Sequence, residues 1–215
     1  MRFTITVAVI VTVGLAGVLV RAQQENMVHV HIGHVADGWQ DTPEGKGLLP
    51  TAVAEAQIAA QHAGFAAGNP DDLAAIKLHT GHVLHAVDPS VMANGPGQGY
   101  GVKKAAAGAA QHIQAAAGTD GASENVATHA PHVATSASNV VAWADEIIDL
   151  AKQVESASSA AAAAELAARI NALTEQIVGG VDADGDGRVG WQEGEGGLQQ
   201  AEQHLGFMKA GEGLS

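Results

Sequence analysis

The chain has 215 residues, of which 47% are hydrophobic and only 3% aromatic, and its formal net charge at pH 7 is −13. Because an acidic surface repels phosphate groups, nucleic acid and anionic membranes are not expected as partners. The absence of cysteine excludes disulfides, thiolate metal sites, iron–sulfur clusters and covalently attached c-type haem, and the alanine-rich composition is typical of an all-helical bundle of closely packed helices.

The N-terminus has the pattern of a cleaved export signal. Arg2 precedes an apolar stretch from about Ile5 to Val20, and the triplet Val20-Arg21-Ala22 follows. Short residues at the first and third places of such a triplet fit a signal-peptidase site, and the apolar stretch is slightly short for a membrane span. We therefore expect cleavage after Ala22, a periplasmic or secreted protein, and no stable membrane anchor.

A short histidine motif occurs three times along the chain. Residues 31–35 read H-I-G-H-V, residues 79–83 read H-T-G-H-V, and residues 129–133 read H-A-P-H-V. The second of the two residues between the histidines is a glycine or a proline in all three copies, and both weaken the interior of a helix. The motif recurs at intervals of 48 and 50 residues. Periods of this size indicate stacked supersecondary units.

Two of these motifs belong to a longer repeat. Segments 59–83 and 109–133 each place one histidine seventeen residues before the first histidine of an H-x-x-H pair. A glycine, Gly68 or Gly118, lies between the single histidine and the pair, so each segment is predicted to be a helical hairpin with its turn at that glycine. The predicted helices cover residues 51–67, 70–87, 102–117 and 123–154, the last bent near Pro131, and residues 89–100 form a glycine-rich loop.

This geometry predicts two three-histidine sites. A helix rises about 1.5 Å per residue, so the single histidine and the pair come to similar heights in an antiparallel hairpin, and residues three apart share a helix face. We expect one site in each hairpin, formed by His62, His79 and His82 in the first and by His112, His129 and His132 in the second. Neutral imidazole binds copper, nickel and zinc, with copper favoured by the Irving–Williams order.

Histidines outside the long repeat rank lower as ligands. His31, His34 and His85 are second-tier metal candidates, and His204 is predicted to lie at the surface. The sequence has no H-E-x-x-H motif, no Glu-x-x-His pair and no nucleophile elbow, so an enzyme is not expected. Residues 24–154 resemble the small exported histidine-rich helical-bundle proteins that bind copper, nickel or zinc, and this resemblance implies metal binding or buffering.

Residues 182–193, D-A-D-G-D-G-R-V-G-W-Q-E, resemble the calcium loop of an EF-hand. Predicted helices at 160–178 and from Trp191 to about Leu205 would flank the loop, as the family requires. The family usually pairs two such loops, and this chain contains one. The resemblance implies calcium bound by the side chains of Asp182, Asp184, Asp186 and Glu193 and by the backbone carbonyl of Arg188.

The predicted organisation is therefore all-α. A signal peptide (1–22) precedes a histidine-rich bundle of duplicated hairpins (23–155), a single EF-hand helix-loop-helix (160–206) and a frayed tail (207–215). The expected function is transition-metal binding or buffering, with calcium fixing the C-terminal part. Two alternatives stay open, a b-type haem bundle in which all six repeated histidines close one site, and a calcium-stabilised interaction module whose histidines are structural. Whether two chains combine as a homo-oligomer and share a site also stays open.

Overall fold

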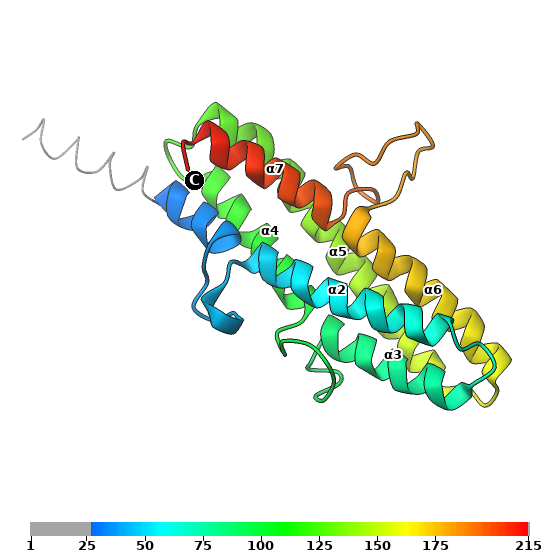
Figure 1. The fold of residues 1–215 in the computed structure, drawn as a ribbon. Helices are drawn as coiled ribbons and strands as arrows, with labels where there is room; N and C mark the ends of the chain where they lie inside the picture. Colours follow the sequence, from blue (N-terminus) through cyan, green and yellow to red (C-terminus); the bar gives the residue numbers. More distant parts are fainter. Residues whose placement is uncertain (1–26, 215) are drawn as a thin grey trace, which may run out of the picture.

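The computed structural model describes residues 27–214, and all regular secondary structure in that range is helical (Figure 1). The all-α prediction is confirmed for these residues, whereas the predicted signal peptide lies outside them. No helix in the described range has the length and apolar character needed to cross a membrane. Residues 27–36 form a first short helix, followed by η1 (Pro43–Gly45), α2 (Leu48–Ala67), α3 (Leu73–Val87), α4 (Val102–Gly118), α5 (Glu124–Ser156), α6 (Ala160–Gly179) and α7 (Leu198–Gly211).

The long helix α5 is the axis of the molecule. Its 33 residues span about 50 Å, and Figure 1 shows the other helices arranged along it. The N-terminal half of α5 packs against α4 and α7, and its C-terminal half packs against α3 and α6. Since α2 contacts α3, α4 and α6, it joins the two ends of an elongated helical bundle.

Small side chains let the helices approach closely. Many fully buried positions of α2, α4 and α6 are alanines, such as Ala59, Ala109 and Ala163. Larger aliphatic residues fill the remaining space, and Ile113 and Ile147 have no exposed surface. Burial of each such side chain stabilises the fold by about 1.5–3 kcal/mol.

The turn between α2 and α3 differs in detail from the prediction. α3 begins at Leu73 rather than at Pro70, because the carboxylate of Asp72 accepts hydrogen bonds from the backbone N–H groups of Ala74 and Ala75. Asp72 is therefore the N-cap, and it satisfies donors that have no partner inside the helix. The hairpin turn itself lies where the sequence placed it.

The start of α5 agrees with the prediction. Ser123 is its N-cap, and its hydroxyl accepts a hydrogen bond of 3.1 Å from the backbone N–H of Val126. The helix continues without interruption through Pro131, which has no N–H to donate to the preceding turn. The H-x-P-H motif is thus part of one continuous helix.

A buried glutamate holds the glycine-rich segment 88–101 against α2. The carboxylate of Glu55 has no exposed surface and accepts hydrogen bonds from the backbone N–H groups of Gln98, Tyr100 and Gly101, at 3.1, 2.9 and 3.1 Å. Gly101 is the N-cap of α4, the helix that carries His112. Glu55 therefore fixes the position at which α4 begins.

The segment 180–197 is a loop over its whole length. The last helix was predicted to begin near Trp191, but α7 begins at Leu198. Asn139 of α5 holds the loop, because its side-chain amide donates to the carbonyls of Gln192 and Gly196 and its oxygen accepts from Gly194 N–H. At the other end, α7 continues to Gly211 with Met208 buried, so most of the tail predicted to fray is helical.

Candidate metal centres

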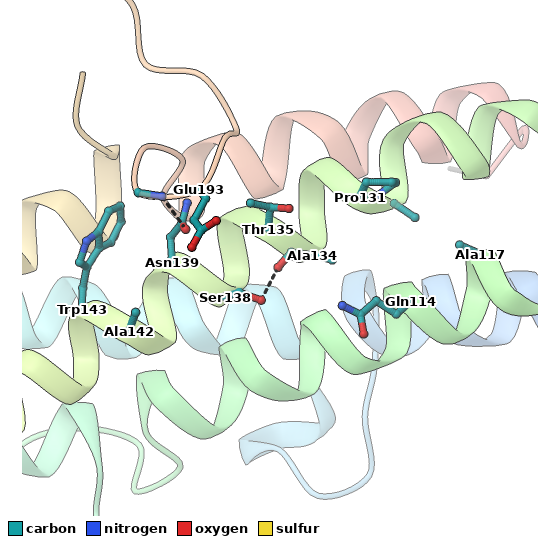
Figure 2. Close-up of a pocket in the computed structure, with 12 residues that line it drawn as sticks. Gln114, Ala117, Pro131, Ala134, Thr135, Ser138, Asn139, Ala142, Trp143 and Glu193 are labelled. Atoms are coloured by element: carbon teal, nitrogen blue, oxygen red, sulfur yellow. Dashed lines mark hydrogen bonds between the residues drawn. The ribbon is translucent and has the colours of Figure 1, made fainter. Parts of the chain in front are cut away.

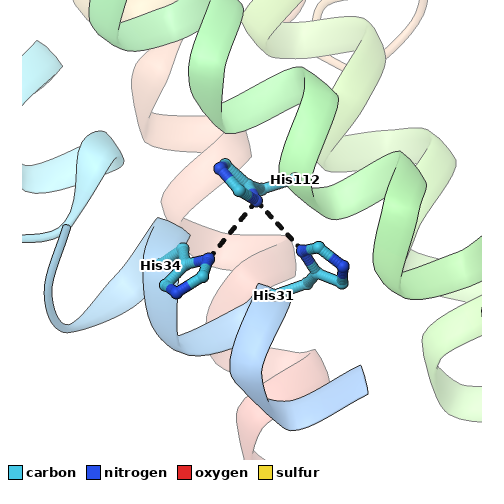
Figure 3. A group of neighbouring side chains, drawn as sticks. All are labelled: His31, His34 and His112. Carbon is cyan, nitrogen blue, oxygen red and sulfur yellow. Dashed lines mark hydrogen bonds between the residues drawn. The ribbon is translucent and has the colours of Figure 1, made fainter. Parts of the chain in front are cut away.

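Nine histidines gather in three clusters of three (Figure 3 shows the first). Within each cluster, one ring nitrogen from each histidine lies within 4.8 Å of the other two. The first cluster contains His31, His34 and His112, the second contains His62, His79 and His82, and the third contains His129, His132 and His204.

All three clusters are built in the same way. An H-x-x-H pair lies on one helix, and a single histidine comes from a neighbouring helix. The pairs lie on residues 27–36, α3 and α5, and the single histidines lie on α4, α2 and α7. The valine after each pair (Val35, Val83 and Val133) is fully buried. Because this valine anchors the helix in the core, the two histidines beside it face the helix that carries the third.

The geometry is nearly identical in the three clusters. From the single histidine to the first histidine of the pair, the Nδ1–Nδ1 distances are 3.0, 3.1 and 3.1 Å for the first, second and third clusters. To the second histidine of the pair they are 3.4, 3.2 and 3.2 Å. The distances between ring centroids are also similar. They are 5.3, 5.4 and 5.3 Å from the single histidine to the first histidine of the pair, and 4.8, 4.6 and 4.4 Å to the second. Three different sequence contexts therefore converge on one arrangement.

Hydrogen bonding alone does not satisfy this arrangement. A ring nitrogen of neutral imidazole either donates one proton or accepts with one lone pair. In the first cluster, His112 Nδ1 approaches the Nδ1 atoms of both His31 and His34, so only one of the two contacts can be a normal hydrogen bond. A bound cation would use the lone pairs of all three nitrogens together.

The spacing of the nitrogens fits a tetrahedral metal ion. With Zn–N bonds of about 2.0–2.1 Å, the nitrogens of a tetrahedral site lie about 3.3–3.4 Å apart. The observed Nδ1–Nδ1 distances of 3.0–3.4 Å are close to this value. Three protein ligands leave a fourth position for water or another ligand.

The environment of the clusters favours neutral imidazole. Burial is the main cause that lowers the pKa of His34, His62, His82, His112 and His132, and neighbouring histidines lower it further. The strongest effect is on His204, where burial, followed by His132 and His129, lowers the pKa to about 4. Only the neutral ring has a free lone pair that could bind a metal, so these lowered pKa values favour the form of the ring that a metal requires.

Tryptophans border the first and third clusters, and phenylalanines border the second and the third, where Phe207 lies 5.5 Å from His129. In the first, the Trp39 ring lies 4.6 Å from His34 and 4.7 Å from His112, measured between centroids. In the third, Trp191 of the loop stacks on His132 at 3.8 Å. The second cluster has Phe65, at 5.5 Å from His62 and 5.2 Å from His79.

The structure brings the histidines of one predicted trio together and separates those of the other. His62, His79 and His82 meet as expected. His112 does not meet His129 and His132 but joins His31 and His34, which had ranked second, and the pair on α5 joins His204, which was predicted to be a surface residue. The reason is that α5 packs against both α4 and α7, and its histidine pair faces α7.

A sequence signal for the third cluster existed. Each single histidine follows a glutamine, and residues 61–65, Q-H-A-G-F, match residues 203–207, Q-H-L-G-F. The pattern Q-H marks the three single histidines, and the pattern H-x-x-H-V marks the three pairs. His85 belongs to neither pattern, and in the structure it is buried with Nδ1 2.8 Å from the carbonyl oxygen of Met92, outside the three clusters.

The acidic loop brings together three of its five predicted calcium ligands. Carboxylate oxygens of Asp182, Asp184 and Asp186 lie within 4.8 Å of one another. The Asp182 carboxylate also accepts backbone hydrogen bonds from within the loop, among them one of 2.9 Å from Gly187 N–H, and Arg188 N–H donates to Asp186. Glu193 is not part of this group.

Glu193 instead borders a cleft of about 710 Å³ between α4, α5 and the loop, where Figure 2 places it beside Asn139 and Thr135. Alanines, Pro131 and Trp143 form much of the cleft wall, and no histidine lines it. The six repeated histidines thus lie in three separate clusters and do not surround this cavity.

Comparison of the chain with protein-family models, with curated proteins and with solved structures found no match.

Proposed function

We propose that the protein binds transition-metal ions at its three histidine clusters, one ion in each, and serves as an exported metal-binding or metal-buffering protein. The observation that carries this proposal is the repetition of one three-imidazole geometry at three places in the fold. Metal buffering benefits from several equivalent sites, whereas catalysis requires one site with a substrate beside it. Binding rather than catalysis is therefore the proposed role.

The ligand set limits the metals that fit. Imidazole nitrogen suits copper, nickel and zinc, and without thiolates the Irving–Williams order favours copper. The near-tetrahedral spacing of the nitrogens suits zinc. The imidazoles add no charge when neutral, so the acidic side chains elsewhere, which give the formal net charge of −13, offset the charge of the ions.

Metal stoichiometry tests the proposal. The full chain, loaded with zinc or copper and freed of excess metal, is expected to retain three ions. Replacing one single histidine, by His62→Ala, His112→Ala or His204→Ala, should remove one ion each. His29→Ala is the matched control, because His29 pairs with Glu212 and belongs to no cluster. Full metal content in the triple His62→Ala, His112→Ala, His204→Ala variant would disprove metal binding by the clusters.

Calcium binding by the acidic loop is a second proposed activity. Its support is the convergence of Asp182, Asp184 and Asp186, together with the EF-hand-like sequence. Full EF-hand coordination requires Glu193 to turn from the cleft toward the three aspartates when calcium binds. Calcium titration by calorimetry should then show weaker binding for Glu193→Gln than for the unchanged protein. Equal binding would mean that Glu193 is not a ligand.

The haem alternative has less support than metal binding. A bis-histidine haem needs two imidazoles on opposite sides of one cavity, whereas the cleft of about 710 Å³ has no histidine in its wall. Absorbance after incubation with haem distinguishes the two, because a b-type complex gives an intense Soret band that three-histidine copper or zinc sites do not give.

A further inference from the structure

The three clusters differ in how far apart along the chain their ligands lie. In the second cluster the single histidine and the two histidines of the pair are 17 and 20 residues apart, within the α2–α3 hairpin. In the first they are 81 and 78 residues apart, and in the third 75 and 72. The first cluster joins residues 27–36 to α4, and the third joins α7 to α5.

This difference changes what a bound ion does to the fold. The second cluster is assembled by a short turn capped by Asp72, so its three imidazoles are close even without metal. The other two clusters exist only when residues 27–36 or α7 are docked on the bundle. Closing a longer loop costs more entropy, so an unfolded chain holds an ion less readily between residues 81 or 75 apart than between residues 17 apart. Ions in the first and third clusters therefore couple more strongly to folding.

The aromatic neighbours of the imidazoles also favour easier release of an ion from the second cluster than from the other two. An imidazole must rotate away before its ion can leave, and a packed indole resists that rotation. Trp39 packs on two imidazoles of the first cluster, and Trp191, in the loop held by Asn139, stacks on His132 of the third. The aromatic neighbour of the second cluster is Phe65, whose surface is 45% exposed.

We propose that the second cluster is the site through which the protein takes up and releases metal, whereas the ions of the first and third clusters clamp residues 27–36 and α7 in place. This inference rests on the proposed function. The acceptor of the exchanged ion is a competing ligand with nitrogen or oxygen donors that approaches the side of the α2–α3 hairpin at Phe65.

Release kinetics test the proposal with variants that keep one cluster intact. His112→Ala with His204→Ala leaves the second cluster, His62→Ala with His204→Ala leaves the first, and His62→Ala with His112→Ala leaves the third. Each variant is loaded with zinc and mixed with an excess of a chelating dye, and circular dichroism checks that it is folded. The ion of the second cluster is expected to leave about tenfold faster, which corresponds to a barrier lower by about 1.4 kcal/mol.

The full chain provides a second measurement. Zinc release should be biphasic, with one fast ion and two slow ions. Trp39→Leu and Trp191→Leu should each accelerate one slow ion, whereas Trp143→Leu, which changes an indole in the cleft wall, should leave all the rates unchanged. Three ions that leave at one common rate would overturn the exchange proposal and leave the proposed function intact, whereas an absence of bound zinc would overturn both.

Discussion

At the scale of single residues, His204 shows how burial keeps a candidate metal ligand neutral. Its neighbours on α5, His129 and His132, lie against it, and burial lowers its pKa from the ordinary value of 6.5 to about 4. The ring therefore stays neutral far below neutral pH, which preserves its lone pair for a metal. The same burial makes protonation of the folded state unfavourable.

This pKa shift predicts that the metal-free protein is less stable in mild acid. The unfolded chain takes up a proton on His204 near pH 6.5, but the folded chain takes it up only near pH 4. The contribution of His204 to stability is therefore complete above about pH 6.5, falls as the pH drops toward 4 and is constant below that. Urea unfolding between pH 7.5 and 4 measures the effect, and His204→Ala should show a weaker loss over this range. An unchanged pH dependence in that variant would contradict the assignment.

At the scale of elements, the first cluster depends on where α4 begins. α4 carries His112, and the position of α4 is set by Glu55, which accepts three backbone hydrogen bonds at the end of the glycine-rich segment. A buried carboxylate is stabilised only when such partners are present. The start of α4 and the geometry of the first cluster are thus linked through one side chain.

Glu55→Ala is expected to destabilise the fold by about 3 kcal/mol or more, because it leaves three N–H groups without an acceptor. Denaturant unfolding measures this change. The variant should also bind metal more weakly at the first cluster than at the second, and Glu55→Gln, which keeps one acceptor oxygen, should lose less stability than the alanine variant. Equal stability of the two variants would show that the hydrogen bonds to Glu55 are not responsible.

At the scale of the whole molecule, the proposed metal ions would act as three cross-links in a bundle with a small-residue core. Alanine buries little area, so the core gains less from hydrophobic burial than one rich in leucine and isoleucine. No disulfide adds to it, since the chain has no cysteine. Metal ions between helices are therefore expected to contribute a large share of the stability.

Loading the clusters should raise the melting temperature in steps. One ion at a free concentration of 100 Kd stabilises the folded state by about 2.7 kcal/mol, which for a chain of this size raises Tm by about 5–10 °C. Differential scanning calorimetry with zinc and with a chelator measures the difference. The His112→Ala and His204→Ala variants should each lose more of this increase than His62→Ala, because the clusters that they remove close longer stretches of chain. A melting temperature that does not respond to zinc would contradict the role of the ions as cross-links.

Local patterns in the sequence determined the helices and the second cluster. Caps, glycines and apolar spacing act within a few residues, so the helices of the α2–α3 and α4–α5 regions lie within a few residues of the predicted ranges. The second cluster was predictable because a short turn fixes which histidines of α2 and α3 face each other. The Q-H and H-x-x-H-V patterns also contain all nine clustered histidines.

Only the tertiary structure decided how the other six histidines combine. α5 has different partners along its length, and no local rule states whether its histidine pair faces α4 or α7. That choice depends on the packing of buried faces across the bundle. The packing brings His112 beside residues 31 and 34, and it brings His204 beside the histidine pair of α5. Likewise, the bonds from Asn139 on α5 to the loop are long-range, and α7 begins only beyond that loop, at Leu198.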